Sequence, residues 1–409
     1  MTIARGKRTD SEIRWAERYP ELGRGPLPVE PCVSEEYFRL EQERVFKEVW
    51  LYVARVEEMP QPGDYLVKDL AVASTSILLV RGKDGVIRGF HNMCSHRGNK
   101  LVWNQQGNCR GFKCKFHTWL YDMQGQLVNV PDEALFFDFD KHEHGLTPVA
   151  TEVWEGFIFI NLSPTPAETL EEYLGEMVER NRGFPFEKYT ASYGYKVVLN
   201  CNWKIILDAF TEEYHVPFLH GRWGGGALTS SNNPLCHLLY VELYQRHRVS
   251  GVNGNPDHKP FPVMAIAHQF GTTFLKRGAG VSVENLPPSV NPDRRQDFSF
   301  EKQAIFPNFL LHLVDGTYFT HQFWPLNVNQ TLWEGKTYYP PARNAAERFS
   351  QEYAHLLMRE NWLEDTSTME NTHTMLRSGA KTHFILQDNE ILLRHSYKVL
   401  EDYVGFYQP

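Results

Sequence analysis

Two short segments of this chain decide its fold: Cys-Ser-His-Arg-Gly at residues 94–98 and Cys-Lys-Phe-His-Thr-Trp at residues 114–119. Each segment supplies one thiol and one imidazole, and each continues into residues typical of a turn. Two cysteines and two histidines on two short loops form a complete set of metal ligands. We therefore expect the two segments to lie on loop tips that face each other.

Two kinds of metal centre use two cysteines and two histidines. A Rieske-type [2Fe–2S] centre has two Cys on one iron and two His on the other, and its potential is roughly −150 to +300 mV, against about −400 mV for an all-Cys plant-type cluster. A structural zinc site holds the same four side chains in a tetrahedron. The Cys-x-His spacing fits zinc fingers poorly, so the sequence favours a [2Fe–2S] centre. Its predicted ligands are Cys94, His96, Cys114 and His117.

Composition and charge narrow the class of protein. The 409 residues suggest two domains, and 42% apolar with 13% aromatic residues suffices for large cores. The net charge is −8 and the basic residues are scattered, which argues against a nucleic-acid partner. Neither a secretory signal nor an apolar run of the ~20 residues that a membrane helix needs is visible. Six cysteines in such a chain do not indicate a disulfide framework, so we expect a cytoplasmic protein.

The distribution of helix, strand and turn signals along the sequence predicts an N-terminal arm and two domains. Residues 1–50 read as an extended arm and a helix that packs on the second domain. Residues 51–162 form short strands separated by turns, which predicts a small all-β domain that contains both cysteine–histidine segments. Residues 163–409 mix helices, strands and long loops, which predicts an α+β domain with room for an internal cavity.

Local signals place individual elements. In the first part, Ser34 is predicted to cap a helix that runs to about Trp50, a hairpin turns at residues 83–85, and residues 156–160 form a buried strand. In the second part a hairpin turns at residues 315–316. Helices are predicted at residues 170–178, about 202–216, from beyond Pro341 to Gly379, and from about Asn389 to Gly405.

A second group of metal-ligating residues lies near residue 215. Glu212 and His215 are three apart and would share one helical face. His220 would point elsewhere on an ideal helix, but Pro217 disfavours helix just before it and lets the chain bend. Two imidazoles with a carboxylate from elsewhere would make a ferrous-iron site with open positions. Among seventeen histidines such a pair also arises by chance, but the electrons of the upstream cluster need an acceptor.

The chain resembles the α subunits of the Rieske non-haem iron oxygenases, the aromatic-ring-hydroxylating dioxygenase group, over nearly its whole length. Residues 94–98 with 114–119 resemble the family's cluster motif, and Asn-Trp-Lys at 202–204 followed by residues 212–220 resembles its iron motif. The resemblance implies an α+β protein with an all-β Rieske domain and a helix-grip catalytic domain, in which an antiparallel sheet is held by long C-terminal helices. It also implies that His215 and His220 bind a mononuclear Fe(II).

The resemblance assigns two further carboxylates. The third iron ligand of the family comes from a C-terminal helix, which points to Asp365 in the stretch 364–370, with Glu364 as the alternative. Glu212 takes the place of a bridging carboxylate that links the iron site to a cluster histidine of a neighbouring subunit. The ring dioxygenases have Asp there, and Glu resembles the family's α-only oxygenases. This departure argues weakly against a required β subunit.

The resemblance also implies an activity and partners. The chain would be the oxygenase component of a multicomponent system that uses O₂ and electrons from NAD(P)H. It would hydroxylate, or cis-dihydroxylate, an apolar and cyclic or aromatic small molecule. No nicotinamide or flavin fingerprint is visible, so a separate reductase, with or without a ferredoxin, would deliver the electrons. The implied assembly is a homotrimer. From charge and hydropathy we expect neither a nucleic-acid nor a membrane partner.

Two alternatives remain at this point. A Rieske monooxygenase could hydroxylate or demethylate a quaternary amine, whose cation aromatic side chains would surround. A Rieske domain joined to a non-catalytic ligand-binding domain would hold no mononuclear iron. Seven residues are candidates to line a substrate pocket, although residues of these types more often belong to an ordinary core: Phe210, Phe218, Trp223, Leu238, Phe309, His312 and Phe323.

Overall fold

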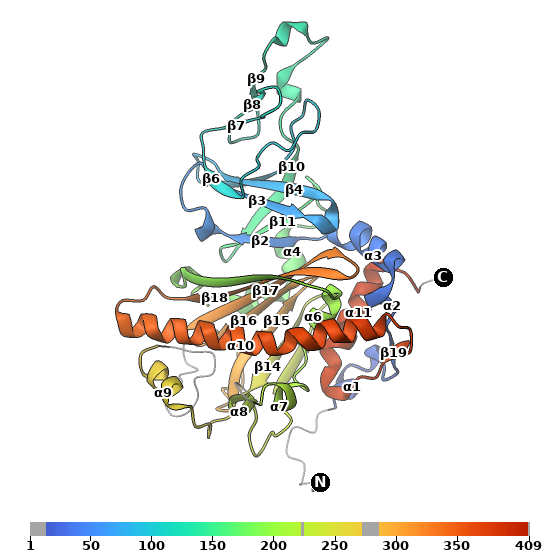
Figure 1. Cartoon of the computed structure of the whole chain (residues 1–409), viewed down its shortest axis with the longest axis vertical. Coiled ribbons are helices and arrows are strands. Elements are labelled where there is room, and N and C mark those ends of the chain that lie inside the picture. Colours follow the sequence, from blue (N-terminus) through green and yellow to red (C-terminus); the bar gives the residue numbers. More distant parts are fainter. Residues whose placement is uncertain (1–13, 222–224, 272–285, 408–409) are drawn as a thin grey trace. The chain divides into compact units, whose positions relative to one another are not determined.

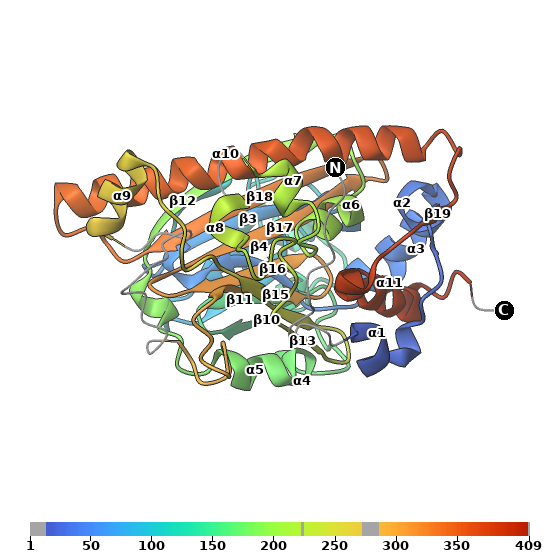
Figure 2. The same ribbon diagram turned by 90° about the horizontal axis from the view of Figure 1, so that it is seen from below.

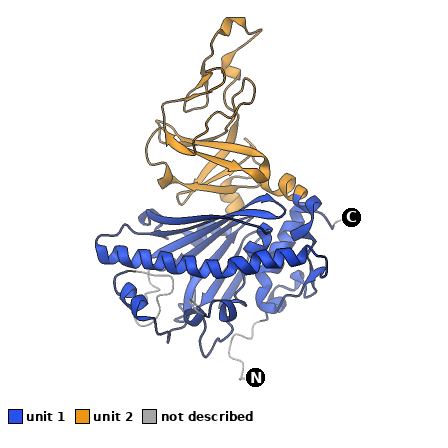
Figure 3. Cartoon of the chain, viewed as in Figure 1, with its two compact units in different colours: residues 1–38, 176–409 blue, residues 39–175 orange. Residues whose placement is uncertain are grey.

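The computed structural model describes residues 14–221, 225–271 and 286–407. The chain divides into two compact units, residues 39–175 and residues 1–38 with 176–409 (Figure 3). The sequence placed the corresponding boundaries near residues 50 and 162, about a dozen residues away. The smaller unit consists mainly of strands, and the larger unit combines strands with long helices, as expected. The chain as a whole is therefore α+β. Within the described residues, no helix combines the length and apolar character needed to cross a membrane.

The smaller unit, residues 39–175, is built on an antiparallel sheet (Figure 1). The sheet order is β2-β11-β10-β5-β4-β3-β6, and a smaller sheet has the order β7-β8-β9. The strands are β2 Leu51–Arg55, β3 Asp64–Leu70, β4 Thr75–Arg81, β5 Ile87–His91, β6 Gln106–Asn108, β7 Phe112–Lys113, β8 Leu120–Tyr121, β9 Leu127–Asn129, β10 Pro148–Trp154 and β11 Phe157–Asn161.

The predicted hairpin and buried strand of this unit are confirmed. β4 and β5 form the hairpin around Gly85, whose φ of +80° suits glycine at the turn. Every residue of β11 is buried, as its unbroken apolar sequence indicates. The two cysteine–histidine loops leave a common core that includes Cys94, Cys114 and Trp119. The core therefore fixes both loops at their bases.

The larger unit is an antiparallel sheet with long helices. The described strands are ordered β12-β18-β17-β16-β15-β14-β13. Figure 2 shows α10 running along this sheet, and it packs against α6 and α9. The strands are β12 Ala191–Leu199, β13 Tyr240–Leu243, β14 Arg248–Asn253, β15 Phe298–Ile305, β16 Phe309–Val314, β17 Thr317–Asn327 and β18 Gln330–Tyr339; β1 Leu27–Pro28 pairs separately with β19 His383–Phe384. The described α-helices of the whole chain are α1 Trp15–Arg18, α2 Glu30–Val33, α3 Glu35–Glu41, α4 Leu170–Leu174, α5 Glu176–Asn181, α6 Trp203–Ala209, α7 Val216–Leu219, α8 Gly225–Leu228, α9 Pro262–Gln269, α10 Ala345–Leu376 and α11 Ile391–Val404. Of these, α4 belongs to the smaller unit and α3 crosses the boundary between the units at Arg39.

The two C-terminal helices begin and end as the sequence predicts. The Asn344 side chain caps α10 by accepting the N–H of Glu347 at 2.9 Å. α11 ends at Gly405, whose φ of +63° places it in the left-handed conformation of a helix C-terminus. The hairpin between β16 and β17 turns at Gly316, which also has a positive φ. These features confirm the sheet and long helices expected for this unit.

Three predicted helices differ in the structure. The helix after Ser34 changes to a π-helical turn at Gln42–Phe46 and ends before Trp50. The expected helix at 170–178 is divided at Gly175, whose φ is +51°. The expected helix at 202–216 ends at Ala209, and α7 begins only at Val216. Pro217 lies in the first turn of α7, where its missing N–H costs nothing, so it starts a helix and does not bend one.

Candidate metal centres

The two predicted cluster loops contain the same kind of backbone turn. Gly98 donates its N–H to the carbonyl of Cys94 at 2.9 Å, and Thr118 donates to Cys114 at 3.0 Å. Both donors have a positive φ, +73° for Gly98 and +60° for Thr118. A β-branched residue rarely adopts this conformation, so the turn imposes it on Thr118. The loops therefore present Cys94 and Cys114 in the same way.

The loops bring the predicted cluster ligands together. Nδ1 of His96 lies 3.1 Å from Nδ1 of His117, and the two thiols are close enough to shift each other's pKa. Cys94 and Cys114 are buried, whereas both imidazoles are partly exposed. Two cysteines on one side and two histidines on the other match the ligand set of a Rieske cluster.

Hydrogen-bond donors surround the two sulfurs. The Tyr121 hydroxyl accepts the N–H of Ser95 at 3.0 Å and lies 3.3 Å from Sγ of Cys94, so its own proton can be donated to that sulfur. Asn99 donates to Sγ of Cys114 at 3.6 Å. Burial raises the pKa of Cys94. Burial also acts on Cys114, but backbone N–H groups of its own loop outweigh it and lower the pKa. Such donors suit sulfurs that carry negative charge.

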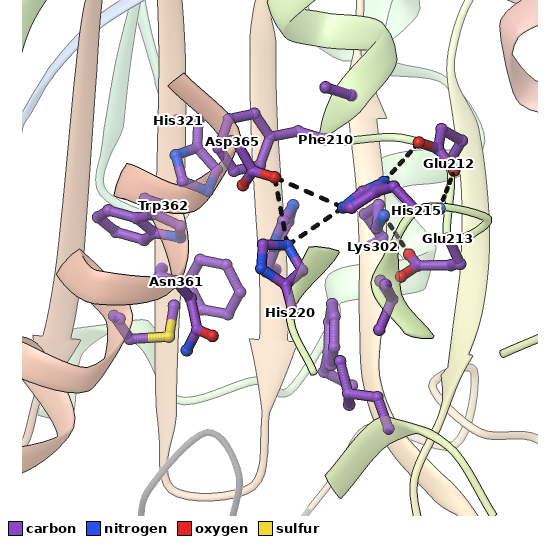
Figure 4. Close-up of a pocket in the computed structure, with 17 residues that line it drawn as sticks. Phe210, Glu212, Glu213, His215, His220, Lys302, His321, Asn361, Trp362 and Asp365 are labelled. Carbon is purple, nitrogen blue, oxygen red and sulfur yellow. Dashed lines mark hydrogen bonds and ion pairs between the residues drawn. The ribbon is translucent and has the colours of Figure 1, made fainter. Parts of the chain in front are cut away.

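A second set of ligands converges in the larger unit (Figure 4). The Nε2 atoms of His215 and His220 are 3.2 Å apart. Oδ1 of Asp365 lies 3.2 Å from Nε2 of His220 and 3.6 Å from Nε2 of His215. His215 immediately precedes the short helix α7 and His220 immediately follows it, while Asp365 projects from α10. One ligand atom from each residue thus lies within 4.8 Å of the others, which suits a single metal ion.

A carboxylate contacts the second ring nitrogen, Nδ1, of each imidazole. Nδ1 of His215 contacts the Glu212 carboxylate, and Nδ1 of His220 lies 2.8 Å from Oε2 of Glu364. A carboxylate accepts only, so each Nδ1 carries a proton. Each Nε2 faces Asp365 and would present its lone pair to a bound metal ion. Glu364, the alternative third ligand in the sequence, instead positions His220 in the structure. Asp365 is the carboxylate that meets both Nε2 atoms.

The raised pKa values of His215 and His220 indicate that this site stabilises positive charge. Burial alone would lower the pKa of His220, but Asp365 and Glu364 raise it to about 9. The pKa of His215 is raised in the same way against burial, mainly by Glu212. Buried carboxylates crowded around two imidazoles stabilise positive charge. A divalent ion bound by the two Nε2 atoms and Asp365 would supply that charge, so the residues fit a mononuclear iron.

Glu212 is held by a turn and not by a helix. Its carboxylate accepts the backbone N–H of Tyr214 and, at 3.2 Å, that of His215. Burial would raise the pKa of Glu212, but its contacts with His215 lower it. The expected common helical face is therefore wrong, since α6 ends at Ala209. The turn achieves the same pairing of Glu212 with His215 by a different backbone.

A cavity of about 80 Å³ opens beside the three converging side chains. Of the candidate pocket residues, Phe210 and His312 line it, and Phe323 stacks on Phe210 at a centroid distance of 5.8 Å. Phe218 lines a second cavity, Leu238 and Phe309 are core residues, and Trp223 lies outside the described residues. Lining residues that sequence reasoning missed include Phe300, Lys302, Phe319, His321, Asn361 and Trp362.

Two family comparisons match this arrangement. Residues 186–405 match "Ring hydroxylating alpha subunit (catalytic domain)", and residues 49–140 match "Rieske [2Fe-2S] domain". The chain belongs to the ring-hydroxylating α-subunit family, with a Rieske domain in its first half. Membership in the family implies a Rieske [2Fe–2S] cluster and a mononuclear iron.

Known relatives include both dioxygenase and monooxygenase subunits. The α subunit of chlorobenzene dioxygenase from Cupriavidus sp. is 35% identical over 298 residues, 68% of this chain and 64% of that protein. The α subunit of 2-aminobenzenesulfonate 2,3-dioxygenase from Alcaligenes sp. is 35% identical over 46% of this chain and 48% of that protein. The oxygenase subunit of carnitine monooxygenase from Acinetobacter pittii is 32% identical over 44% and 49%. The chain spans about half the length of most of the curated relatives it matches.

Solved structures share the fold over nearly the whole chain. A quaternary ammonium Rieske monooxygenase has a TM-score of 0.75 at 18% identity and covers 97% of this chain and 99% of its own. Naphthalene 1,2-dioxygenase from Rhodococcus sp. has a TM-score of 0.74 at 19% identity, with the same coverage. These similarities confirm an α+β fold with a Rieske domain and a catalytic sheet held by helices.

Proposed function

We propose that this protein is the oxygenase component of a multicomponent Rieske oxygenase. It uses O₂ and electrons from NAD(P)H, delivered by a separate reductase with or without a ferredoxin, to hydroxylate a cyclic or aromatic small molecule. The observation that carries the proposal is the convergence of His215, His220 and Asp365 on one point at the wall of a ring-lined cavity.

The proposal gives each group of residues a task. Cys94, His96, Cys114 and His117 would hold the [2Fe–2S] cluster, which supplies electrons one at a time. The iron held by the two histidines and Asp365 would supply activation of O₂.

Residues around the iron site would prepare it for that reaction. Glu212 and Glu364 keep both imidazoles in the tautomer that presents Nε2 to the metal. Phe210, Phe319 and Trp362 would hold a substrate ring beside the iron and exclude water from it.

The proposed assembly is a homotrimer in which Glu212 links the iron site of one chain to a cluster histidine of the next. Glu212 lines both the ring-lined cavity and a second cavity that also reaches Glu390 and Tyr397. A carboxylate with access from two sides suits a group that contacts His215 and a further partner. A β subunit is not required by this proposal.

A second candidate is hydroxylation or demethylation of a quaternary amine. Similarity to carnitine and glycine betaine monooxygenase subunits supports it. The ring-rich cavity wall, with Phe210, Phe319 and Trp362, could surround a cation.

Metal content tests the class of protein. Anaerobically purified chain is expected to hold about three irons and two acid-labile sulfides, two irons from the cluster and one mononuclear. Two irons with two sulfides would instead identify a non-catalytic Rieske protein, and zinc without sulfide would identify a zinc module. Coupling of NADH oxidation to O₂ uptake over arenes, steroids and methylamines then separates the two substrate classes.

A further inference from the structure

Two histidines face the cavity from neighbouring strands. His312 on β16 pairs with Phe319 on β17, and His321 lies two residues further along β17. Residues opposite each other in an antiparallel pair share a face, so both imidazoles lie on the same face of the sheet. Their ring centroids are 5.2 Å apart, and both residues line the cavity beside the predicted iron ligands.

The tautomer of His321 follows from its neighbour Trp333. The indole Nε1 of Trp333 donates to Nδ1 of His321 at 3.1 Å, and an indole nitrogen can only donate. Nδ1 of His321 is therefore an acceptor. Burial and the nearby Lys302 lower the pKa of His321 to about 3, so the ring is neutral and its single proton sits on Nε2.

That Nε2–H of His321 is a buried donor in need of an acceptor. The side chain is fully buried, and among the described residues no acceptor lies within hydrogen-bond distance of Nε2. His312 is 3% exposed, and neither of its ring nitrogens has a partner in the described chain. Buried polar groups in proteins are nearly always paired, with protein, water or ligand. Two such imidazoles side by side in a cavity indicate a polar group of a bound molecule.

The surroundings of His321 show where that polar group would sit. Phe210 lies 4.4 Å from the His321 ring and Trp362 lies 4.7 Å from it, measured between centroids. Figure 4 shows His321 on the cavity wall together with Phe210, Trp362 and Asp365. A ligand ring stacked on this wall would place one substituent against the histidines. Any water held there would be displaced by a substituent that makes the same hydrogen bonds.

The charge of the cavity selects the kind of acceptor. Lys302 is the lysine among the described lining residues, and it is paired with Glu213. The charge of an iron at His215 and His220 would already be matched by the carboxylates of Asp365, Glu212 and Glu364. An oxyanion at the histidines would be buried without a counter-charge of its own, which is unfavourable. A quaternary ammonium group cannot accept a hydrogen bond. A neutral oxygen, such as a carbonyl or hydroxyl, meets both conditions.

We infer that the substrate is a cyclic molecule with a neutral oxygen substituent, which accepts the Nε2–H of His321, with His312 as the second hydrogen-bonding partner. The inference rests on the proposed function and narrows its substrate class. It distinguishes an oxygen-bearing ring from a bare hydrocarbon, an oxyanion and a quaternary amine. His321 then determines specificity without contact with the metal.

Binding to the resting holoenzyme without reductant tests the inference, because no turnover occurs. The probes are isosteric pairs, acetophenone against α-methylstyrene and 1-acetylnaphthalene against 1-isopropenylnaphthalene, with benzoate as the oxyanion; dissociation constants are measured by calorimetry. We expect each ketone to bind at least about tenfold more tightly than its alkene, since a site that pairs a polar group rejects the analogue without it. His321→Phe should remove this preference, and His321→Gln, which keeps a donor, should restore part of it.

A matched control and the contrary outcomes complete the experiment. His355→Phe replaces a histidine of α10 that bonds Tyr195 at 2.6 Å and lies outside the cavity, so its ketone preference should equal that of the wild type. Iron, sulfide and the visible spectrum show that each variant is folded and loaded. Equal binding of ketone and alkene, tightest binding of benzoate, or an unchanged preference in His321→Phe would overturn the inference. Failure of every probe to bind would also overturn it, but would leave the proposed function standing, since that rests on metal content.

Discussion

Oε2 of Glu364 lies 2.8 Å from Nδ1 of His220, while Oδ1 of the adjacent Asp365 lies 3.2 Å from Nε2 of the same ring. Two consecutive carboxylates of α10 thus meet opposite nitrogens of one imidazole. His215 approaches the His220 ring on the Nε2 side, where Asp365 lies, and not on the Nδ1 side. The proposed site gives these neighbouring acids different tasks: Asp365 would complete the set of metal ligands, and Glu364 would orient one of them.

Asp365→Ala should abolish the mononuclear iron. Removing it leaves two imidazoles and no carboxylate at the point where the Nε2 atoms meet, whereas the cluster loops lie in the other unit. Iron per chain should fall by about one, from three to two, with two sulfides and an unchanged visible spectrum. Full iron content and turnover in this variant would show that another residue is the third ligand.

Glu364→Gln should weaken iron binding without preventing it. The amide can still contact His220, but it no longer favours the tautomer with the proton on Nδ1 as a carboxylate does. Loss of such a supporting carboxylate typically costs about 10–100-fold in metal affinity. Iron retention during titration with a chelator measures the change. A variant with wild-type retention would remove the positioning role from Glu364.

The convergence of the candidate cluster ligands could be predicted from the sequence, because short-range spacing determines it. Turns after Cys94 and Cys114 fix one cysteine and one histidine each, and these signals are local. The backbone between Ala209 and Val216 could not be predicted, since a proline fits the first turn of a helix as well as a break. Asp365 required the family resemblance, because α10 brings it to His215 over a long stretch of chain.

The cavity wall was the least predictable part. Every residue of β15 and β16 is buried, so their sequences lack the alternation that would show which face meets the cavity. His312 was among the candidate pocket residues, but the equally buried His321 was not. The hydrogen bond that fixes its tautomer comes from Trp333 on the neighbouring strand β18, a pairing that the local sequence does not show.

Tyr121→Phe should lower the reduction potential of the cluster. The hydroxyl that now faces Sγ of Cys94 stabilises negative charge on sulfur, which is greater in the reduced state. A hydrogen bond that contributes about 1 kcal/mol more to the reduced state corresponds to a fall of roughly 50 mV on its removal. Potentiometric titration of the visible spectrum measures it. An unchanged potential would show that the hydroxyl does not donate to the sulfur.

Thr118→Gly should stabilise the smaller unit. Thr118 has a φ of +60° and is exposed, so glycine would relieve backbone strain and lose little packing. The expected gain is about 1 kcal/mol in the free energy of unfolding, reduced by the greater freedom of glycine in the unfolded chain. Gly98→Thr, at the matching position of the other loop, should destabilise the unit. Denaturant unfolding followed at the cluster's absorbance compares the two, and a less stable Thr118→Gly would contradict the strain.

Glu212→Gln should keep both metals yet slow electron delivery to the iron. His215 and the backbone N–H groups of its turn can still bond the amide oxygen, so iron should be retained. A carboxylate that links His215 to a cluster histidine of a neighbouring chain also carries a charge that the amide lacks, and the amide cannot accept from two imidazoles with equal strength. Single-turnover oxidation of a pre-reduced cluster should therefore slow by at least about tenfold, while metal content stays constant. Glu152→Gln, on β10 in the other unit, is the matched control and should leave the rate unchanged. Wild-type single-turnover rates in Glu212→Gln would exclude the bridging role and leave Glu212 as a support for His215 alone.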